Sequence, residues 1–106
     1  MKTCFDEIRR LTGVNAKHRK GFRLKSATPM LATDHAFDEA CELREAVRGY
    51  TRSVAAGNQN KNAVKLEMAD VLGCIYHLAI MLDISEADLS SAVLQKLAER
   101  FSEEEP

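Results

Sequence analysis

The stretch KLEMADVLGCIYHLAIMLD, from Lys65 to Asp83, decides the fold of this chain. It opens with two carboxylates, Glu67 and Asp70, and then carries no formal charge until its last residue. At about 100° per residue these carboxylates share one side of a helix with Cys74 and His77, and the rest of the surface is apolar. A helix that is apolar nearly all round is typically buried. Desolvated carboxylates on such a helix are costly without a partner, so a basic side chain, a metal ion or both should face them.

The length of 106 residues suits a single domain, residues 1–106. A domain this small buries a limited fraction of its surface, so the apolar central helix indicates that a second copy of the chain completes the burial. We therefore expect a homo-oligomer, a dimer at least and with a tetramer as a further option. The formal net charge of −1 does not favour nucleic acid as a partner.

The apolar run Val71–Leu82 is too short to span a bilayer, and the N-terminus lacks the apolar core of a signal peptide, so no membrane partner is expected. The three cysteines are an odd number without close spacing, which is typical of reduced thiols in a cytoplasmic protein. They are Cys4, Cys41 and Cys74.

Four helical periods and the lack of any strand pattern predict an all-α subunit of four helices, which would pack with a second subunit into an oligomeric bundle. The helices are expected at about 3–12, 34–56, 62–82 and 86–101, with Asp34 and Ser85 as the N-caps of the second and fourth. The core stripe of the second helix is predicted from apolar residues at steps of three and four, namely Phe37, Ala40, Leu43, Val47 and Tyr50.

Residues 13–33 are predicted to form a basic loop, since no acidic residue occurs between Ile8 and Thr33. A loop of this length in a compact domain is usually functional or disordered. Two interpretations stay open: a solvated surface loop, or a segment that closes over an anionic substrate. For the second, Lys17, Arg19 and Lys20 are the nearest candidates.

A second carboxylate pair lies on the predicted second helix, where Glu39 and Glu42 in E-A-C-E match Glu67 and Asp70 in E-M-A-D. Side chains at positions i and i+3 lie on the same flank of a helix. Two antiparallel helices joined by a short loop can bring such pairs together. Converging oxygen ligands suit a hard cation such as Mg²⁺, which usually binds a few carboxylates together with substrate phosphates.

Two other interpretations of these acidic residues stay open. The carboxylates on the second helix can lie on a solvent-exposed face, where Arg44 and Arg48 neutralise their charge. Alternatively, Cys74 and His77 share the flank of the second pair, so a zinc or iron site in a carboxylate helical bundle is conceivable, although the E-x-x-H pairs of di-iron bundles are missing.

The carboxylate pattern resembles that of the MazG-type nucleotide pyrophosphohydrolases of the all-α NTP pyrophosphatase superfamily. Here D-E-A-C-E (38–42) is followed after 24 residues by E-M-A-D (67–70), an apolar helix and a K-x-x-x-R helix. The signature of the family is EExxE, a gap of about this length, and ExxD. The resemblance covers about residues 34–101. Asp38 stands where the family often has Glu, and the basic loop and first helix match no pattern of the family.

This resemblance implies a Mg²⁺-dependent hydrolase, with Mn²⁺ as a substitute, that cleaves NTP or dNTP between the α and β phosphates to NMP and pyrophosphate, as in nucleotide-pool house-cleaning. The four carboxylates would hold the ions, and one of them, Glu39 by preference, would activate the attacking water. The basic pair of the last helix, Lys96 and Arg100, would bind the β and γ phosphates.

The candidates for stacking on the nucleobase are Phe5 and Phe22. A non-enzymatic hypothesis also stays open: an obligate helical oligomer that acts as a protein-binding module, its carboxylates paired with Lys96 and Arg100.

Overall fold

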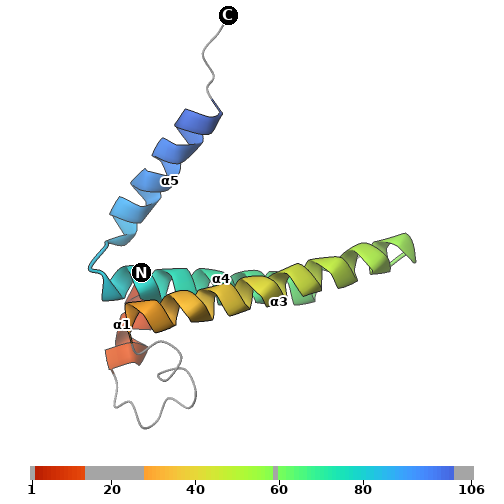
Figure 1. Cartoon of the computed structure of the whole chain (residues 1–106), viewed down its shortest axis with the longest axis horizontal. Coiled ribbons are helices and arrows are strands. Elements are labelled where there is room, and N and C mark those ends of the chain that lie inside the picture. Colours follow the sequence, from red (N-terminus) through yellow and green to blue (C-terminus); the bar gives the residue numbers. More distant parts are fainter. Residues whose placement is uncertain (1, 14–27, 59, 102–106) are drawn as a thin grey trace, which may run out of the picture.

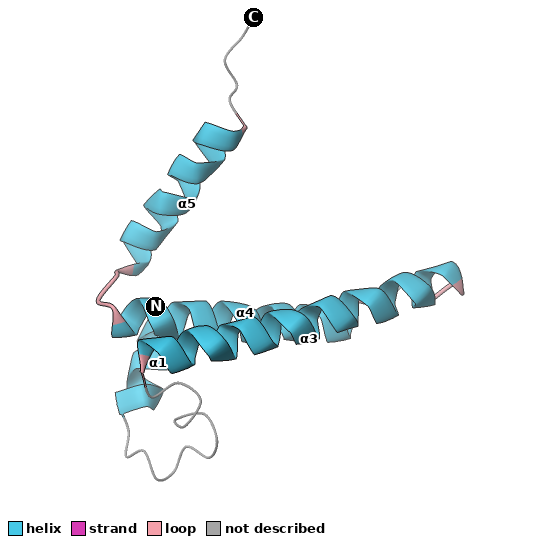
Figure 2. Ribbon diagram, viewed as in Figure 1, coloured by secondary structure: helices cyan, strands magenta, loops and turns pink. Residues whose placement is uncertain are grey.

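In a computed structural model, residues 2–13, 28–58 and 60–101 are described, and they form helices and connections without strands (Figures 1 and 2). The helices are α1 (Cys4–Gly13), α3 (Pro29–Ala55), α4 (Asn62–Met81) and α5 (Glu86–Arg100). The all-α prediction is confirmed. The predicted substrate-loop residues Lys17, Arg19 and Lys20, like Phe22, lie outside the described residues.

No single described helix combines the length and hydropathy needed to cross a membrane. Among the described helices, α4 and α5 taken together reach that length and composition, with an angle of 116° between them.

Helix α3 begins earlier than its sequence pattern predicts, and the assignment of Asp34 as its N-cap is wrong. The N-cap is Thr28, whose hydroxyl oxygen accepts a hydrogen bond of 3.1 Å from the backbone N–H of Leu31. Pro29 occupies the first helical position, where its fixed φ suits a helix and its missing N–H costs nothing. Residues 29–33, predicted as part of the basic loop, are therefore helical.

The remaining boundaries are close to the predicted ones. Helix α3 ends at Ala55, and Gly57 follows in the left-handed region at φ 92°, which only glycine adopts without cost. Ser85 is confirmed as the N-cap of α5, because its hydroxyl accepts a 3.0 Å hydrogen bond from the N–H of Asp88. These signals, a glycine after a helix and a serine before one, are local and therefore readable from sequence.

Helices α3 and α4 lie side by side and antiparallel, and they form the main contact of the fold (Figure 1). The connection between them is ordered by two asparagine side chains. The side-chain oxygen of Asn58 accepts from the N–H of Asn60 at 3.0 Å, and that of Asn60 accepts from the N–H of Asn62 at 2.9 Å. This tight reversal sets the register in which the two helices face each other.

The face of α3 that packs on α4 overlaps the predicted core stripe only in part. Phe37 and Val47 are 69% and 42% exposed, whereas Ala32 and His35 are buried and Glu39 is largely buried. The true stripe has the same period of three and four but is rotated around the helix, and it includes a histidine and a glutamate. Leu43 and Tyr50 of the predicted stripe are partly buried and continue this face, so the prediction is met in part and misses the polar members of the stripe.

Helix α1 packs across α4 through Phe5, which is 1% exposed. Its ring lies 5.0 Å from that of Tyr76 on α4, and the guanidinium of Arg9 lies 5.7 Å from its centroid. An aromatic ring enclosed in this way offers no face to a nucleobase. The structure therefore excludes Phe5 as a base-stacking residue.

Helix α5 leaves α4 at 116° and points away from the α3–α4 pair, with few contacts to α4 (Figure 2). The burial expected for the central helix is incomplete within one chain, since large apolar side chains of α4 are half exposed. On α4 these are Leu66, Met68 and Leu72, and on α5 they continue with Val93, Leu94 and Leu97.

Candidate metal centre

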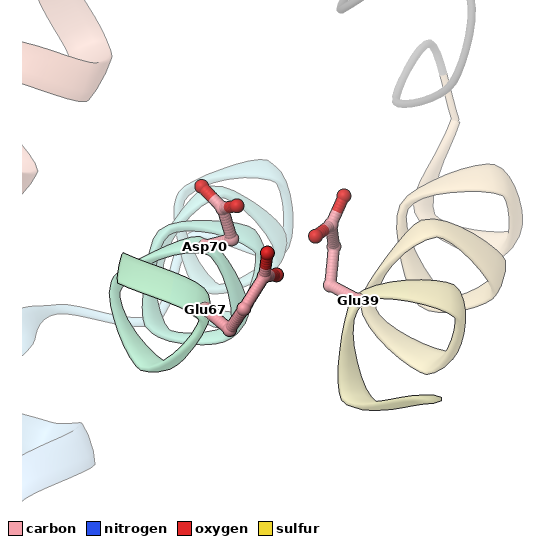
Figure 3. A group of neighbouring side chains, drawn as sticks. All are labelled: Glu39, Glu67 and Asp70. Carbon is pink, nitrogen blue, oxygen red and sulfur yellow. The ribbon is translucent and has the colours of Figure 1, made fainter. Parts of the chain in front are cut away.

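Three carboxylates converge between α3 and α4 and are here called the acidic cluster. Glu39 comes from α3, and Glu67 and Asp70 come from α4 (Figure 3). One oxygen of each lies within 4.8 Å of the others. A single cation can bridge ligand oxygens at such separations, so the described residues include a set that fits a metal ion.

The register of the two helices explains why these residues meet. Across the interface, the Sγ atom of Cys74 lies 3.6 Å from Nδ1 of His35. Moving four residues forward along α3 and four back along α4 brings Glu39 opposite Asp70, because the helices are antiparallel. Three residues further along each helix are Glu42 and Glu67, and Glu67 joins the converging group whereas Glu42 does not. The spacing of the two sequence motifs is therefore the spacing that places carboxylate opposite carboxylate.

Burial makes the acidic cluster electrostatically costly. The side chain of Glu39 is 14% exposed, and its Oε2 atom and the Oε2 atom of Glu67 are buried without a hydrogen-bond partner. Burial raises the pKa of Glu39, and the negative charges of Glu42 and Asp70 raise it further, while a hydrogen bond from His35 opposes the rise. Buried acceptors in this state need a proton or a cation.

Lysine and arginine side chains do not supply that positive charge in the described part of the chain, and the basic group that contacts the acidic cluster there is the imidazole of His35, 3.2 Å from Glu39. Arg48 pairs with Glu45 on its own helix at 3.0 Å. Among the described residues, no Lys or Arg lies within 4.0 Å of the carboxylates of the two motifs. The interpretation in which Arg44 and Arg48 neutralise the first pair therefore does not describe the structure.

Glu42 is the outlying member of the predicted set. It is exposed and does not belong to the group whose ligand atoms converge. It nevertheless lies close enough to Glu39 to raise the pKa of that carboxyl. The structure thus brings three of the four predicted carboxylates together and leaves the fourth at the exposed edge.

The ligand set consists of oxygen alone in the described residues. Cys74 and His77 are buried on the same helix as Glu67 and Asp70, but neither belongs to a converging group of three ligands. The thiol of Cys74 contacts His35 instead. An all-carboxylate set favours a hard cation such as Mg²⁺ or Mn²⁺ over zinc or iron.

Lys96 and Arg100 lie on α5, the helix that extends away from the α3–α4 pair (Figure 1). They line a hollow of about 320 Å³ together with Ala92, Val93 and Leu97. Both residues therefore border apolar side chains of the last helix. Within one chain, however, α5 does not carry them towards Glu39, Glu67 and Asp70.

His35 is a residue of the site that the sequence interpretation missed. Its ring is 9% exposed, and its Nε2 atom lies 3.2 Å from Oε1 of Glu39, one turn along α3. The available signal was spacing: His35 precedes Glu39 by four residues, which places the two side chains on one face. Because histidines are common in helices for other reasons, that spacing alone does not single out a site.

Comparison of the chain with family models, with curated proteins and with solved structures found no match.

Proposed function

We propose that this protein is a Mg²⁺-dependent nucleoside triphosphate pyrophosphohydrolase of the MazG-like type. It would cleave NTP or dNTP between the α and β phosphates, giving the monophosphate and pyrophosphate, with Mn²⁺ as a substitute ion. The observation that carries the proposal is the convergence of Glu39, Glu67 and Asp70 across α3 and α4, with two buried oxygens left without partners.

The chemistry of the ligand set supports a phosphate substrate. A cluster of carboxylates repels a triphosphate, so the two can meet only through cations that both sides bind. Mg²⁺ takes few protein ligands and retains positions for water and for phosphate oxygens. Bound there, Mg²⁺ would neutralise charge on the phosphates and lower the pKa of a coordinated water.

Each of the four carboxylates has its own role in this proposal. Glu67 and Asp70, one turn apart on α4, hold a cation against the helix pair. Glu39 is the best candidate to orient and deprotonate the attacking water, because its burial and acidic neighbours raise its pKa and so make it a stronger base. Glu42, at the exposed edge, is placed to complete the ligands when substrate is bound.

The phosphate-binding role of Lys96 and Arg100 requires an assembly. We propose a homo-oligomer, a dimer at least, in which a second copy covers the apolar residues of α4 and α5. Half-exposed Leu72 and 67% exposed Leu94 support this, because a chain this small gains stability by burying such residues. The same packing would bring Lys96 and Arg100 to the acidic cluster of another copy. A cytoplasmic location and a role in nucleotide-pool house-cleaning belong to the same proposal.

The test is a screen of the common NTPs and dNTPs with purified protein and Mg²⁺, read by ³¹P NMR. The expected products are the monophosphate and pyrophosphate. Release of orthophosphate would point to a different phosphatase chemistry, and no turnover of any triphosphate with Mg²⁺ or Mn²⁺ would refute the proposal. Glu45→Gln, which alters an exposed carboxylate of α3 that pairs with Arg48, is the matched control and should retain activity.

A further inference from the structure

The two ring nitrogens of His35 have different partners, one on its own helix α3 and one on α4. Nε2 lies 3.2 Å from Oε1 of Glu39, and Nδ1 lies 3.6 Å from Sγ of Cys74. The imidazole and the thiol are both buried, at 9% and 6% exposure. One ring nitrogen therefore contacts a carboxylate of the acidic cluster, and the other contacts a residue of the opposite helix.

The donors follow from the chemistry of the groups. An ionised carboxylate accepts hydrogen bonds and has none to donate, so the hydrogen of a neutral imidazole must be on Nε2. Nδ1 then carries the lone pair, and the S–H of Cys74 donates to it. A serine at position 74 would keep a donor there, whereas an alanine would remove it.

This arrangement fixes how Glu39 faces the acidic cluster. With Oε1 held by His35, the other oxygen, Oε2, is buried and makes no hydrogen bond. One oxygen of Glu39 also lies within 4.8 Å of ligand oxygens of Glu67 and Asp70. A glutamate has three rotatable side-chain bonds, and ordering them costs free energy on cation binding unless the conformation is already set. The imidazole supplies that order before the cation arrives.

We propose that His35 is a positioning residue of the metal centre, which orients the Glu39 carboxylate through Nε2–H and is itself held in that tautomer by the thiol of Cys74. The inference rests on the proposed metal site. It adds to that site a residue outside both carboxylate motifs, which supports a metal ligand without binding the metal itself. Such outer-layer partners typically change metal affinity by about 10–100-fold when they are removed.

The first test measures Mn²⁺ affinity alone, by the loss of the free-ion EPR signal on titration, without substrate. His35→Leu should weaken binding by about tenfold or more, whereas His35→Gln should remain within about threefold of the wild type, because its amide N–H can replace Nε2–H. Equal losses in both variants would overturn the positioning role.

His77→Leu is the matched control. It removes a buried imidazole from α4 that does not belong to the acidic cluster, so it should lower the melting temperature yet leave Mn²⁺ affinity within about threefold. If His77→Leu weakens Mn²⁺ binding as much as His35→Leu does, the effect is one of general packing and the inference fails.

The second test needs no metal and separates this inference from the proposed function. Long-range ¹H–¹⁵N NMR of the metal-free protein at pH 8 should show His35 in the Nε2–H form. Cys74→Ser should retain that form, and Cys74→Ala should allow a mixture of tautomers. An Nδ1–H ring in the wild type would overturn the inference, whether or not the protein binds Mn²⁺ or hydrolyses triphosphates.

Discussion

Replacing Glu39 by glutamine should make the metal-free protein more stable and should also remove its response to Mg²⁺. The physical reason lies in the acidic cluster, where carboxylate oxygens of Glu39, Glu67 and Asp70 lie within 4.8 Å of one another. Glutamine has nearly the same shape and its side-chain oxygen can still accept from His35, so the change removes charge with little change in packing.

The magnitude follows from Coulomb's law. Two unit charges 4.8 Å apart repel each other by about 3.5 kcal/mol at an effective dielectric constant of 20 and by about 0.9 kcal/mol in bulk water. Asp70 is exposed, which favours the lower part of this range. We expect Glu39→Gln to raise the free energy of unfolding of the metal-free protein at pH 7.5 by about 1–2 kcal/mol. Each kcal/mol should raise the melting temperature by about 4–8 °C.

Magnesium should largely close the gap between the two proteins. With a dissociation constant of about 1 mM, 10 mM Mg²⁺ adds about 1.4 kcal/mol to the wild type and little to the variant. The assay is thermal unfolding by circular dichroism, with and without 10 mM Mg²⁺, at one protein concentration because an oligomer melts in a concentration-dependent way. The control Glu45→Gln should keep both the melting temperature and the Mg²⁺ response of the wild type. Lower stability of metal-free Glu39→Gln together with an unchanged Mg²⁺ response would refute the electrostatic reasoning.

The pH dependence of the metal-free wild type has a definite sign. The folded-state pKa of Glu39 is raised, chiefly by burial, so its contribution to stability is fully present below the unfolded-state pKa and is lost as pH rises through the folded-state pKa. The free energy of unfolding should therefore fall between mildly acidic and neutral pH in EDTA. In Glu39→Gln this part of the fall should be absent, and an identical pH profile in both proteins would contradict the assignment.

Three further predictions concern the reaction and the assembly. Asp70→Asn and Glu42→Gln should each reduce kcat by about 100-fold or more while the circular dichroism spectrum is retained, and near-normal rates in steady-state assays would remove these residues from the site. Lys96→Ala should raise KM for the triphosphate by about tenfold, as expected for loss of a charge-assisted hydrogen bond, and an unchanged KM and kcat would separate α5 from the substrate. Leu72→Lys, on the half-exposed face of α4, should shift the protein towards monomer in light scattering, and an unchanged molar mass would place the interface elsewhere.

Much of the fold was predictable because its signals are local. The glycine after α3, the Ser85 cap and the apolar run of α4 each act through neighbouring residues. The start of α3 was readable too, since Thr28 and Pro29 form a cap and a first turn, but the prediction relied on an acidic N-cap at Asp34 instead.

The candidate site was only partly predictable, because its completion depends on the packing of two helices. The equal spacing of the motifs indicated that four carboxylates could meet, and the structure brings three of them, Glu39, Glu67 and Asp70, together while Glu42 stays at the exposed edge. The role of His35 depends on the contact with Cys74, which lies 39 residues further along the chain, and no periodicity within one helix reveals it.

The measurement that bears most directly on the central claim is X-ray diffraction from crystals of the protein soaked with Mn²⁺, recorded for anomalous scattering. We predict a manganese peak between α3 and α4, within coordination distance of carboxylate oxygens from Glu39, Glu67 and Asp70. A peak at other residues, or none at millimolar Mn²⁺, would show that these carboxylates do not form a metal centre and would contradict the account.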